Sequence, residues 1–183
     1  EMFYIEHMDK NHKLLFHGAK SRIEGKLDIH KSRTNNDLGQ GFYTGERYEQ
    51  AISFISGFEK SSVYIFDFKE EGLKGKKYNV NQEWMMTIAY YRGVLEEYEN
   101  HPIIKKLIEK SCDCDYIIAP IADNRMFQII NSFIMGEITD EQCKHCLAAT
   151  NLGYQYVFKS DKAIKSLKML ERCYISEKEK EYY

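Results

Sequence analysis

The cysteines of this chain are spaced in a way that suggests metal binding. Cys112 and Cys114 are separated by one residue, and Cys143 and Cys146 by two. Four thiolates can hold zinc in a tetrahedral site. However, a single intervening residue is not the usual spacing of zinc ligands, and the second pair falls in a segment whose pattern predicts a helix. We therefore expect structural thiols and no metal, with zinc as the less favoured alternative.

Three polar side chains interrupt segments that otherwise read as buried strands. His17 ends the apolar part of the segment 14–19, Tyr43 lies in a strand bounded by glycines, and Gln155 interrupts the run 154–158. Each one alone is more readily explained as a hydrogen-bonded polar group of the core. Together, on three short strands, they could converge on one cleft.

These three strands together resemble the NAD site of ADP-ribosyltransferases, in the branch of diphtheria toxin and the poly(ADP-ribose) polymerases. In that branch a His-Gly pair, a Tyr in a Gly-x-Gly-[Ile/Phe]-Tyr strand and a Glu before Tyr-x-Val-Tyr form the site. The matching stretches of this chain are Phe16-His17-Gly18, Gly39-Gln40-Gly41-Phe42-Tyr43 and Gln155-Tyr156-Val157-Phe158.

The closer resemblance is to a bacterial family catalogued as a domain of unknown function, DUF3990. It covers about residues 14–170, and the ordered set of blocks is more specific than any one of them. The blocks are Leu15-Phe16-His17-Gly18, Arg33, Asp37-Leu38-Gly39-Gln40-Gly41-Phe42-Tyr43, Glu83-Trp84, Asp115-Tyr116-Ile117-Ile118-Ala119-Pro120-Ile121-Ala122-Asp123, the Gln155 strand and Lys162-Ala163.

The resemblance implies an enzyme that uses NAD+ as a substrate and breaks its nicotinamide–ribose bond. It assigns the backbone of Gly18 to the nicotinamide amide, His17 to the adenosine-side ribose, Tyr43 to stacking on the nicotinamide ring, and Gln155 to the reactive ribose 2′-hydroxyl. Gln155 replaces the Glu of the polymerase pattern and cannot act as a carboxylate base. We therefore predict a mono-ADP-ribosyltransferase. The alternatives are an NAD glycohydrolase and a degenerate module that only binds NAD or ADP-ribose.

Three further residues have a functional and a structural interpretation. Arg33 could pair with the NAD pyrophosphate, because arginine makes bidentate contacts to phosphate, or it could be an exposed loop charge, and the two are equally supported. Asp123 could be an auxiliary carboxylate that activates the acceptor, but the helix N-cap is favoured. Trp84 could wall the cleft, but a core tryptophan on a helix face is favoured.

The resemblance also implies partners. It indicates a bacterial toxin or conflict-system effector that works in the cytoplasm and modifies a protein or a nucleic acid, with a small antitoxin or immunity protein to neutralise it. A nucleic-acid acceptor would require a basic rim beside the site, for which Arg22, Lys26, Lys31 and Arg33 are the candidates.

The composition fits one folded domain over residues 1–183. The chain has 43% apolar residues and a net charge of −2, which excludes a strong chain-wide attraction to nucleic acid or anionic membrane. We see no apolar run long enough to span a membrane and no signal peptide, and an odd number of cysteines favours a reducing cytosol. We expect a core over residues 14–170 and a frayed, charged tail at 176–183.

The elements that must position these residues alternate irregularly along the chain. This order favours an α+β fold, and the resemblance specifies the split β-sheet core of ADP-ribosyltransferases with flanking helices. The expected strands are 14–19, 39–45, 63–68, 115–120 and 154–158, and the expected helices are 46–56, 82–98, 103–110, 125–135, 139–149 and 160–170.

Overall fold

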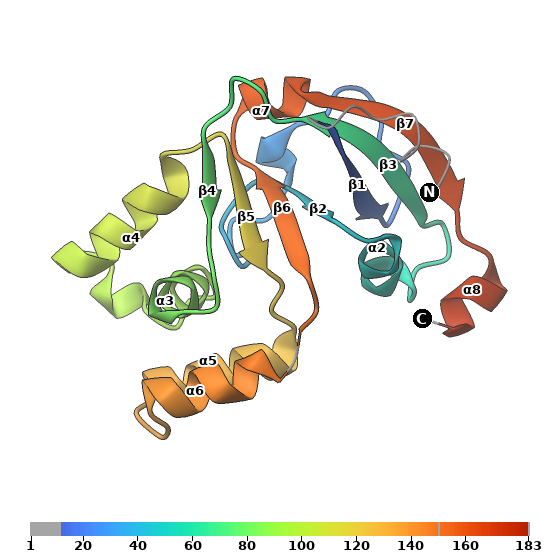
Figure 1. Ribbon diagram of the computed structural model, residues 1–183. Helices are drawn as coiled ribbons and strands as arrows, with labels where there is room; N and C mark the ends of the chain where they lie inside the picture. The colour runs from blue at the N-terminus through green and yellow to red at the C-terminus, as the bar shows by residue number, and fades with distance from the viewer. Residues whose placement is uncertain (1–11, 150, 183) are drawn as a thin grey trace.

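One mixed sheet of seven strands forms the centre of the computed structural model, which describes residues 12–149 and 151–182 (Figure 1). The strand order is β4-β5-β6-β2-β1-β3-β7, and neighbours are antiparallel except for the parallel pair β4 and β5. The bounds are β1 (His12–Ala19), β2 (Phe42–Gly45), β3 (Ser62–Lys69), β4 (Gly75–Lys77), β5 (Tyr116–Pro120), β6 (Tyr154–Phe158) and β7 (Leu167–Tyr174). The α+β class predicted from the sequence is confirmed.

Alternation along the strands divides the apolar side chains between the two faces of the sheet. On β1, Leu15 and Ala19 join a cluster on one face, and Leu14 and Phe16 join a cluster on the other. We call the first the loop face, because the chain segment 23–29 and helix α7 (Asp161–Lys165) cover it. The second is the helical face.

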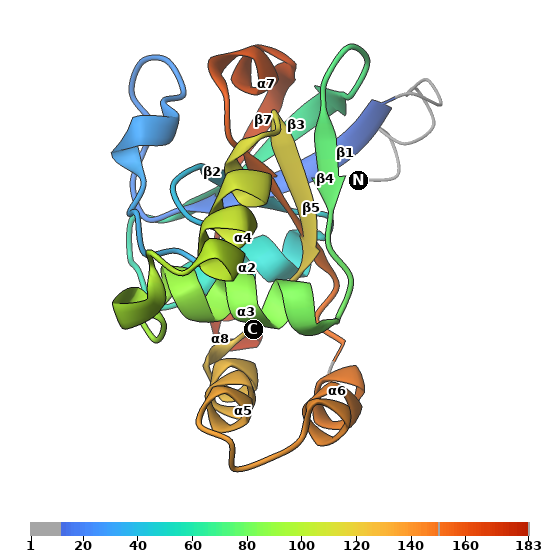
Figure 2. The same ribbon diagram turned by 90° about the vertical axis from the view of Figure 1, so that its left-hand side faces the viewer.

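Two groups of helices cover the helical face. Helix α2 (Tyr48–Ile55) packs Ala51, Ile52 and Ile55 against β1 and β3. The other group packs against β5 and β6, and its members α5 and α6 lie side by side in both views (Figures 1 and 2). This group consists of α3 (Gln82–Tyr91), α4 (Pro102–Cys112), α5 (Asn124–Ile134) and α6 (Asp140–Ala148).

Trp84 belongs to the core of this second group. Its side chain is completely buried beside Met85, Ile88 and the sheet residue Ile117. The structural interpretation of Trp84 is therefore confirmed, and it does not wall a cleft.

Two predicted helices are longer than the observed ones. Helix α3 stops at Tyr91 and the chain turns at Gly93, whose φ of +87° favours glycine. The last helix was predicted to reach residue 170, but α7 ends at Lys165 and β7 follows. The apolar pattern was misleading because Leu167 and Leu170 pack on opposite faces of the sheet, as residues three apart in a strand do.

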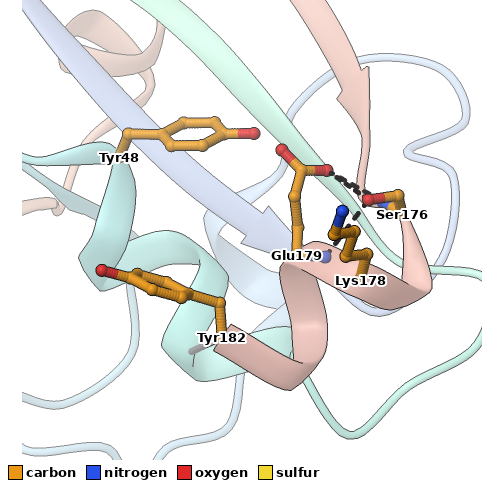
Figure 3. Close-up of a pocket in the computed structure, with 5 residues that line it drawn as sticks. All are labelled: Tyr48, Ser176, Lys178, Glu179 and Tyr182. Carbon is orange, nitrogen blue, oxygen red and sulfur yellow. Dashed lines mark hydrogen bonds between the residues drawn. The ribbon is translucent and has the colours of Figure 1, made fainter.

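The segment predicted as a frayed tail forms helix α8 (Glu177–Tyr182). Ser176 and Glu179 begin it with reciprocal bonds: the Glu179 N–H donates to the Ser176 hydroxyl at 3.2 Å, and the Ser176 N–H donates to the Glu179 carboxylate at 2.9 Å. A pocket of about 350 Å³ lies between this helix and Tyr48 at the start of α2 (Figure 3). Among the described residues, no helix has the length and apolar character needed to cross a membrane.

Candidate functional site

The sheet divides between β1 and β2. The two strands pair in register at Phe16 and Gly45 and then diverge, although β1 stays paired with β3 as far as Ala19, and β2 stays paired with β6 from Phe42. Beyond Phe16, a side-chain hydrogen bond crosses between the halves: Nδ1 of His17 lies 2.6 Å from the Tyr43 carbonyl oxygen. His17 and Gly18 therefore lie on one side of the split, and Tyr43 lies on the other.

The hydrogen bond of His17 fixes the position of its proton. A backbone carbonyl only accepts, so Nδ1 carries the hydrogen and donates it to Tyr43. Burial lowers the pKa of His17, which keeps the ring neutral, and the ring stacks on Phe42 with centroids 4.2 Å apart. A neutral ring with its hydrogen on Nδ1 has an unprotonated Nε2, which can accept a hydrogen bond from a ligand hydroxyl.

Gly18 lies under helix α2. A Cβ at this position would clash with the backbone oxygen of Ala51 and would lie 3.0 Å from Cγ2 of Ile55. The glycine is thus required for the close packing of β1 on α2. Its predicted contact with the nicotinamide amide stays a prediction, and it would involve backbone atoms.

Tyr43 secures the chain segment that precedes its own strand. Its hydroxyl donates to the Gly39 carbonyl at 2.5 Å and accepts from the Leu38 N–H at 3.0 Å. The half-buried ring packs against the core of the helical face, and burial raises the pKa of the phenol, so it stays protonated. Its predicted stacking on nicotinamide stays a prediction.

Two residues that sequence reasoning missed hold the same segment. Nε of Arg92, directly after α3, lies 2.6 Å from the Asp37 carboxylate, and another guanidinium nitrogen donates to the Ala122 carbonyl at 3.3 Å. Lys159, after β6, donates to the Leu38 carbonyl at 2.7 Å, and burial lowers the pKa of its amine. The only sequence signal was their charge beside predicted elements, which does not identify a partner.

Gln155 lies on the helical face in the strand next to Tyr43. In the register it is opposite Gly45 of β2 and Ala119 of β5, and Tyr43 is opposite Val157. Diagonal neighbours of this kind are roughly 7–8 Å apart. The side chain is only 9% exposed, and its amide N–H donates to the Pro120 carbonyl at 3.3 Å, so the amide oxygen is the atom that can accept from a ligand.

The other two predicted residues are at the surface. Arg33 is an exposed residue of the 20–41 loop, and no hydrogen bond or ion pair in the described ranges joins its guanidinium to the strands of the site. Asp123 is exposed and is the N-cap of α5, because its Oδ1 accepts from the Met126 N–H at 2.8 Å. The favoured interpretation of Asp123 as a cap is confirmed.

The cysteines are dispersed. Cys143 is buried in α6 with its sulfur 3.2 Å from that of Met85, and burial raises its pKa to about 11, whereas Cys112 and Cys146 are exposed. Over residues 12–149 and 151–182, no group of three or more His, Cys, Asp or Glu side chains is placed to hold a metal ion. The zinc alternative therefore gains no support.

Comparison with known families gives one match. The family described as "Protein of unknown function (DUF3990)" matches residues 14–169. The chain belongs to the DUF3990 family. In this DUF3990 protein the matched span runs from β1 into β7 and contains His17, Tyr43 and Gln155. Comparisons with curated proteins and with solved structures found no match.

The packing of α2 on β1 predicts the effect of a methyl group at Gly18. Gly18→Ala should lower the free energy of unfolding by about 1–3 kcal/mol, because neither the Ala51 backbone nor β1 can move away freely. Gly57→Ala is the matched control, since a Cβ there meets no atom within 4 Å. Urea denaturation followed by circular dichroism measures both, and equal stability of the two variants would show that α2 does not require the glycine.

The lowered pKa of His17 predicts a pH dependence of stability. As the pH falls through the ordinary histidine value of about 6.5, the unfolded chain takes up the proton before the folded one does, so stability is lost toward acid. This group alone contributes a loss of up to about 1.4 kcal/mol per pH unit. His17→Asn retains an N–H donor for Tyr43 but cannot titrate, so its stability should fall less between pH 7.5 and 5.5.

The control for this comparison is His145→Asn, at an exposed position on α6. Its stability should follow the wild-type pH profile. Parallel profiles for wild type and His17→Asn would contradict the buried, neutral state of His17.

Proposed function

We propose that this DUF3990 protein is an NAD-dependent mono-ADP-ribosyltransferase whose site lies at the split between β1 and β2. The observation that carries the proposal is the position of the three predicted residues. The His17 ring reaches the Tyr43 backbone carbonyl across the split from the loop face. The side chains of Tyr43 and Gln155 lie on the helical face of the two neighbouring strands β2 and β6. The resemblance to the diphtheria-toxin and polymerase branch assigns these three residues to one NAD site.

The state of His17 suits a sugar ligand. With Nδ1 engaged by Tyr43, Nε2 is an acceptor for a ribose hydroxyl. The neutral ring also adds no positive charge near a ribose carbon that becomes cationic when the nicotinamide bond breaks. The His17–Tyr43 bond fixes the orientation of the acceptor before NAD binds.

Gln155 limits the proposed reaction to the transfer of a single ADP-ribose. Its amide oxygen can accept from the ribose 2′-hydroxyl, but the side chain cannot take a proton from a second ADP-ribose. The bond from nicotinamide to C1′ breaks with its electron pair on the leaving group, and an acceptor atom then bonds to C1′ and releases its proton to water. Asp123, three residues beyond β5, is the carboxylate predicted to assist, through the oxygen that does not cap α5.

Phe54 is an additional aromatic candidate for the nicotinamide ring. It lies on the turn of α2 that packs over Gly18, its side chain is 64% exposed, and the Lys20 amine is 5.5 Å from its ring. An exposed ring of this kind can stack on a planar ligand. The sequence feature that could have identified Phe54 is that it is apolar but lies outside the expected buried face of the helix 46–56.

The second candidate function is a module that binds NAD or ADP-ribose without transfer. The neutral Gln155 favours it, because the group that should hold the reactive ribose cannot act as a base. The transferase remains our proposal, because a single transfer does not require that base. An enzyme of this kind would act as a toxin or conflict-system effector that a small partner keeps inactive.

Labelled NAD tests the proposal. Incubation with cell extract should place label on a macromolecule, and His17→Asn should reduce that labelling at least about tenfold, because it removes the Nε2 acceptor and keeps the donor to Tyr43. His145→Asn, a change of the same type on exposed α6, should label as the wild type does.

The other outcomes are distinct. Free ADP-ribose without macromolecular label would identify a glycohydrolase, and NAD binding without either product would identify the binding module. Full labelling by His17→Asn would contradict the assignment of the site.

A further inference from the structure

The loop between β1 and β2 carries a local excess of positive charge. It begins two residues after Gly18, ends two residues before Tyr43, and so connects the two sides of the split. Residues 20–33 contain five basic and two acidic side chains, a local charge of +3 with His30 neutral, in a chain whose net charge is −2. The basic residues are Lys20, Arg22, Lys26, Lys31 and Arg33.

These charges are presented to solvent and are not neutralised within the fold. Arg22, Lys26, Lys31 and Arg33 are exposed, and none of them forms an ion pair with the residues that the structure describes. Of the two acidic residues of this segment, Asp28 forms a hydrogen bond within the loop: its carboxylate accepts from the His30 N–H at 2.9 Å.

The loop is held in shape by the rest of the chain. The Ile23 N–H donates to the Tyr64 hydroxyl of β3 at 2.8 Å, and Ile29 is buried in the core of the loop face. Near the other end, the Gln40 amide donates to the carbonyl oxygens of His30 and Ser32, both at 3.0 Å. In Figure 2 this blue segment projects from the body of the protein at upper left.

Strand β7 adds a cation and an aromatic ring next to the loop. The Arg172 guanidinium lies 5.7 Å from the ring of Tyr64, whose hydroxyl holds Ile23, and 4.3 Å from the ring of Tyr174. Tyr174 is 71% exposed. We call Arg22, Lys26, Lys31, Arg33, Arg172 and Tyr174 the basic loop surface.

We infer that the basic loop surface binds single-stranded nucleic acid and that this strand is the acceptor of ADP-ribose; the acceptor assignment rests on the proposed transferase activity. Regularly spaced phosphates suit several cations that lack acidic partners, and an exposed tyrosine beside an arginine provides a stacking platform for bases. A single strand is required because a base within a duplex cannot reach a site beside the half-buried His17 without being flipped out.

The proposed transfer requires no reactant other than NAD and the acceptor strand. The C1′–nicotinamide bond breaks with its electron pair on nicotinamide, a ring or exocyclic nitrogen or a hydroxyl oxygen of the strand bonds to C1′, and its proton passes to water. The loop joins β1 to β2, the two strands that border the split, and it covers the loop face, on which the His17 ring stacks on Phe42.

Binding is tested with fluorescent single-stranded 20-nucleotide DNA and RNA in anisotropy titrations at 50–200 mM salt. The wild type should bind at least one strand, and more weakly as salt rises. The triple variant Arg22→Glu, Lys26→Glu, Lys31→Glu should lose at least about tenfold in affinity and show a shallower salt dependence, by about 0.7 in logarithmic slope for each phosphate contact removed.

The matched control makes the same change of charge on α4. Lys105→Glu, Lys106→Glu, Lys110→Glu alters three exposed lysines on the other side of the sheet and should bind the oligonucleotides as the wild type does. Equal losses in both triple variants would overturn the inference, as would wild-type binding to polyglutamate but to neither oligonucleotide.

A second measurement separates this inference from the proposed function. With labelled NAD and both acceptor classes present, label on the oligonucleotide that disappears in the loop variant supports the inference. Label on protein alone overturns the acceptor but leaves the transferase intact. Loop-dependent oligonucleotide binding with no label on any macromolecule overturns the transferase and, with it, the acceptor assignment.

Discussion

The hydrogen bond from the His17 imidazole to the Tyr43 carbonyl joins the two halves of the sheet where the strand ladder ends. Beyond the register pair of Phe16 and Gly45, this hydrogen bond adds to packing contacts such as that of the Phe42 ring of β2 with the Phe66 ring of β3. The bond requires a hydrogen on Nδ1, and burial lowers the pKa of the ring, which keeps it neutral. A structural constraint thereby sets the chemical state of the residue that faces the proposed ligand.

The surroundings of the split serve to keep that geometry. Tyr43 holds Leu38 and Gly39 through its hydroxyl, and Arg92 and Lys159 hold the same segment from α3 and β6. Each of these polar groups is half-buried or buried, where an unsatisfied partner is costly. For this reason the candidate residues contribute to stability, and a variant tests the proposed function only if it preserves the internal hydrogen bonds.

Much of this arrangement could be predicted from the sequence, because β-branched and aromatic runs indicate strands, and capping residues and apolar periodicity indicate helices. His17, Tyr43 and Gln155 were assigned to strands that do lie together. The helix predicted over 139–149 is α6, which begins after a capping box formed by Thr139 and Gln142. Arg92 and Lys159 were missed because their partners lie 55 and 121 residues away, and no local pattern encodes such contacts. Strand β7 was missed because a spacing of three residues fits a helix face as well as two sheet faces.

We propose that a neutral His17, protonated on Nδ1, offers Nε2 to NAD at the split between β1 and β2. The most direct measurement is nitrogen NMR of the histidine side chains at pH 7, with His17 assigned by comparison with His17→Asn, before and after addition of NAD. We expect an unprotonated Nε2 in free His17, and we expect its resonance to shift on NAD binding while that of His145 does not. A hydrogen on Nε2, a charged ring, or a resonance that NAD leaves unchanged would contradict it.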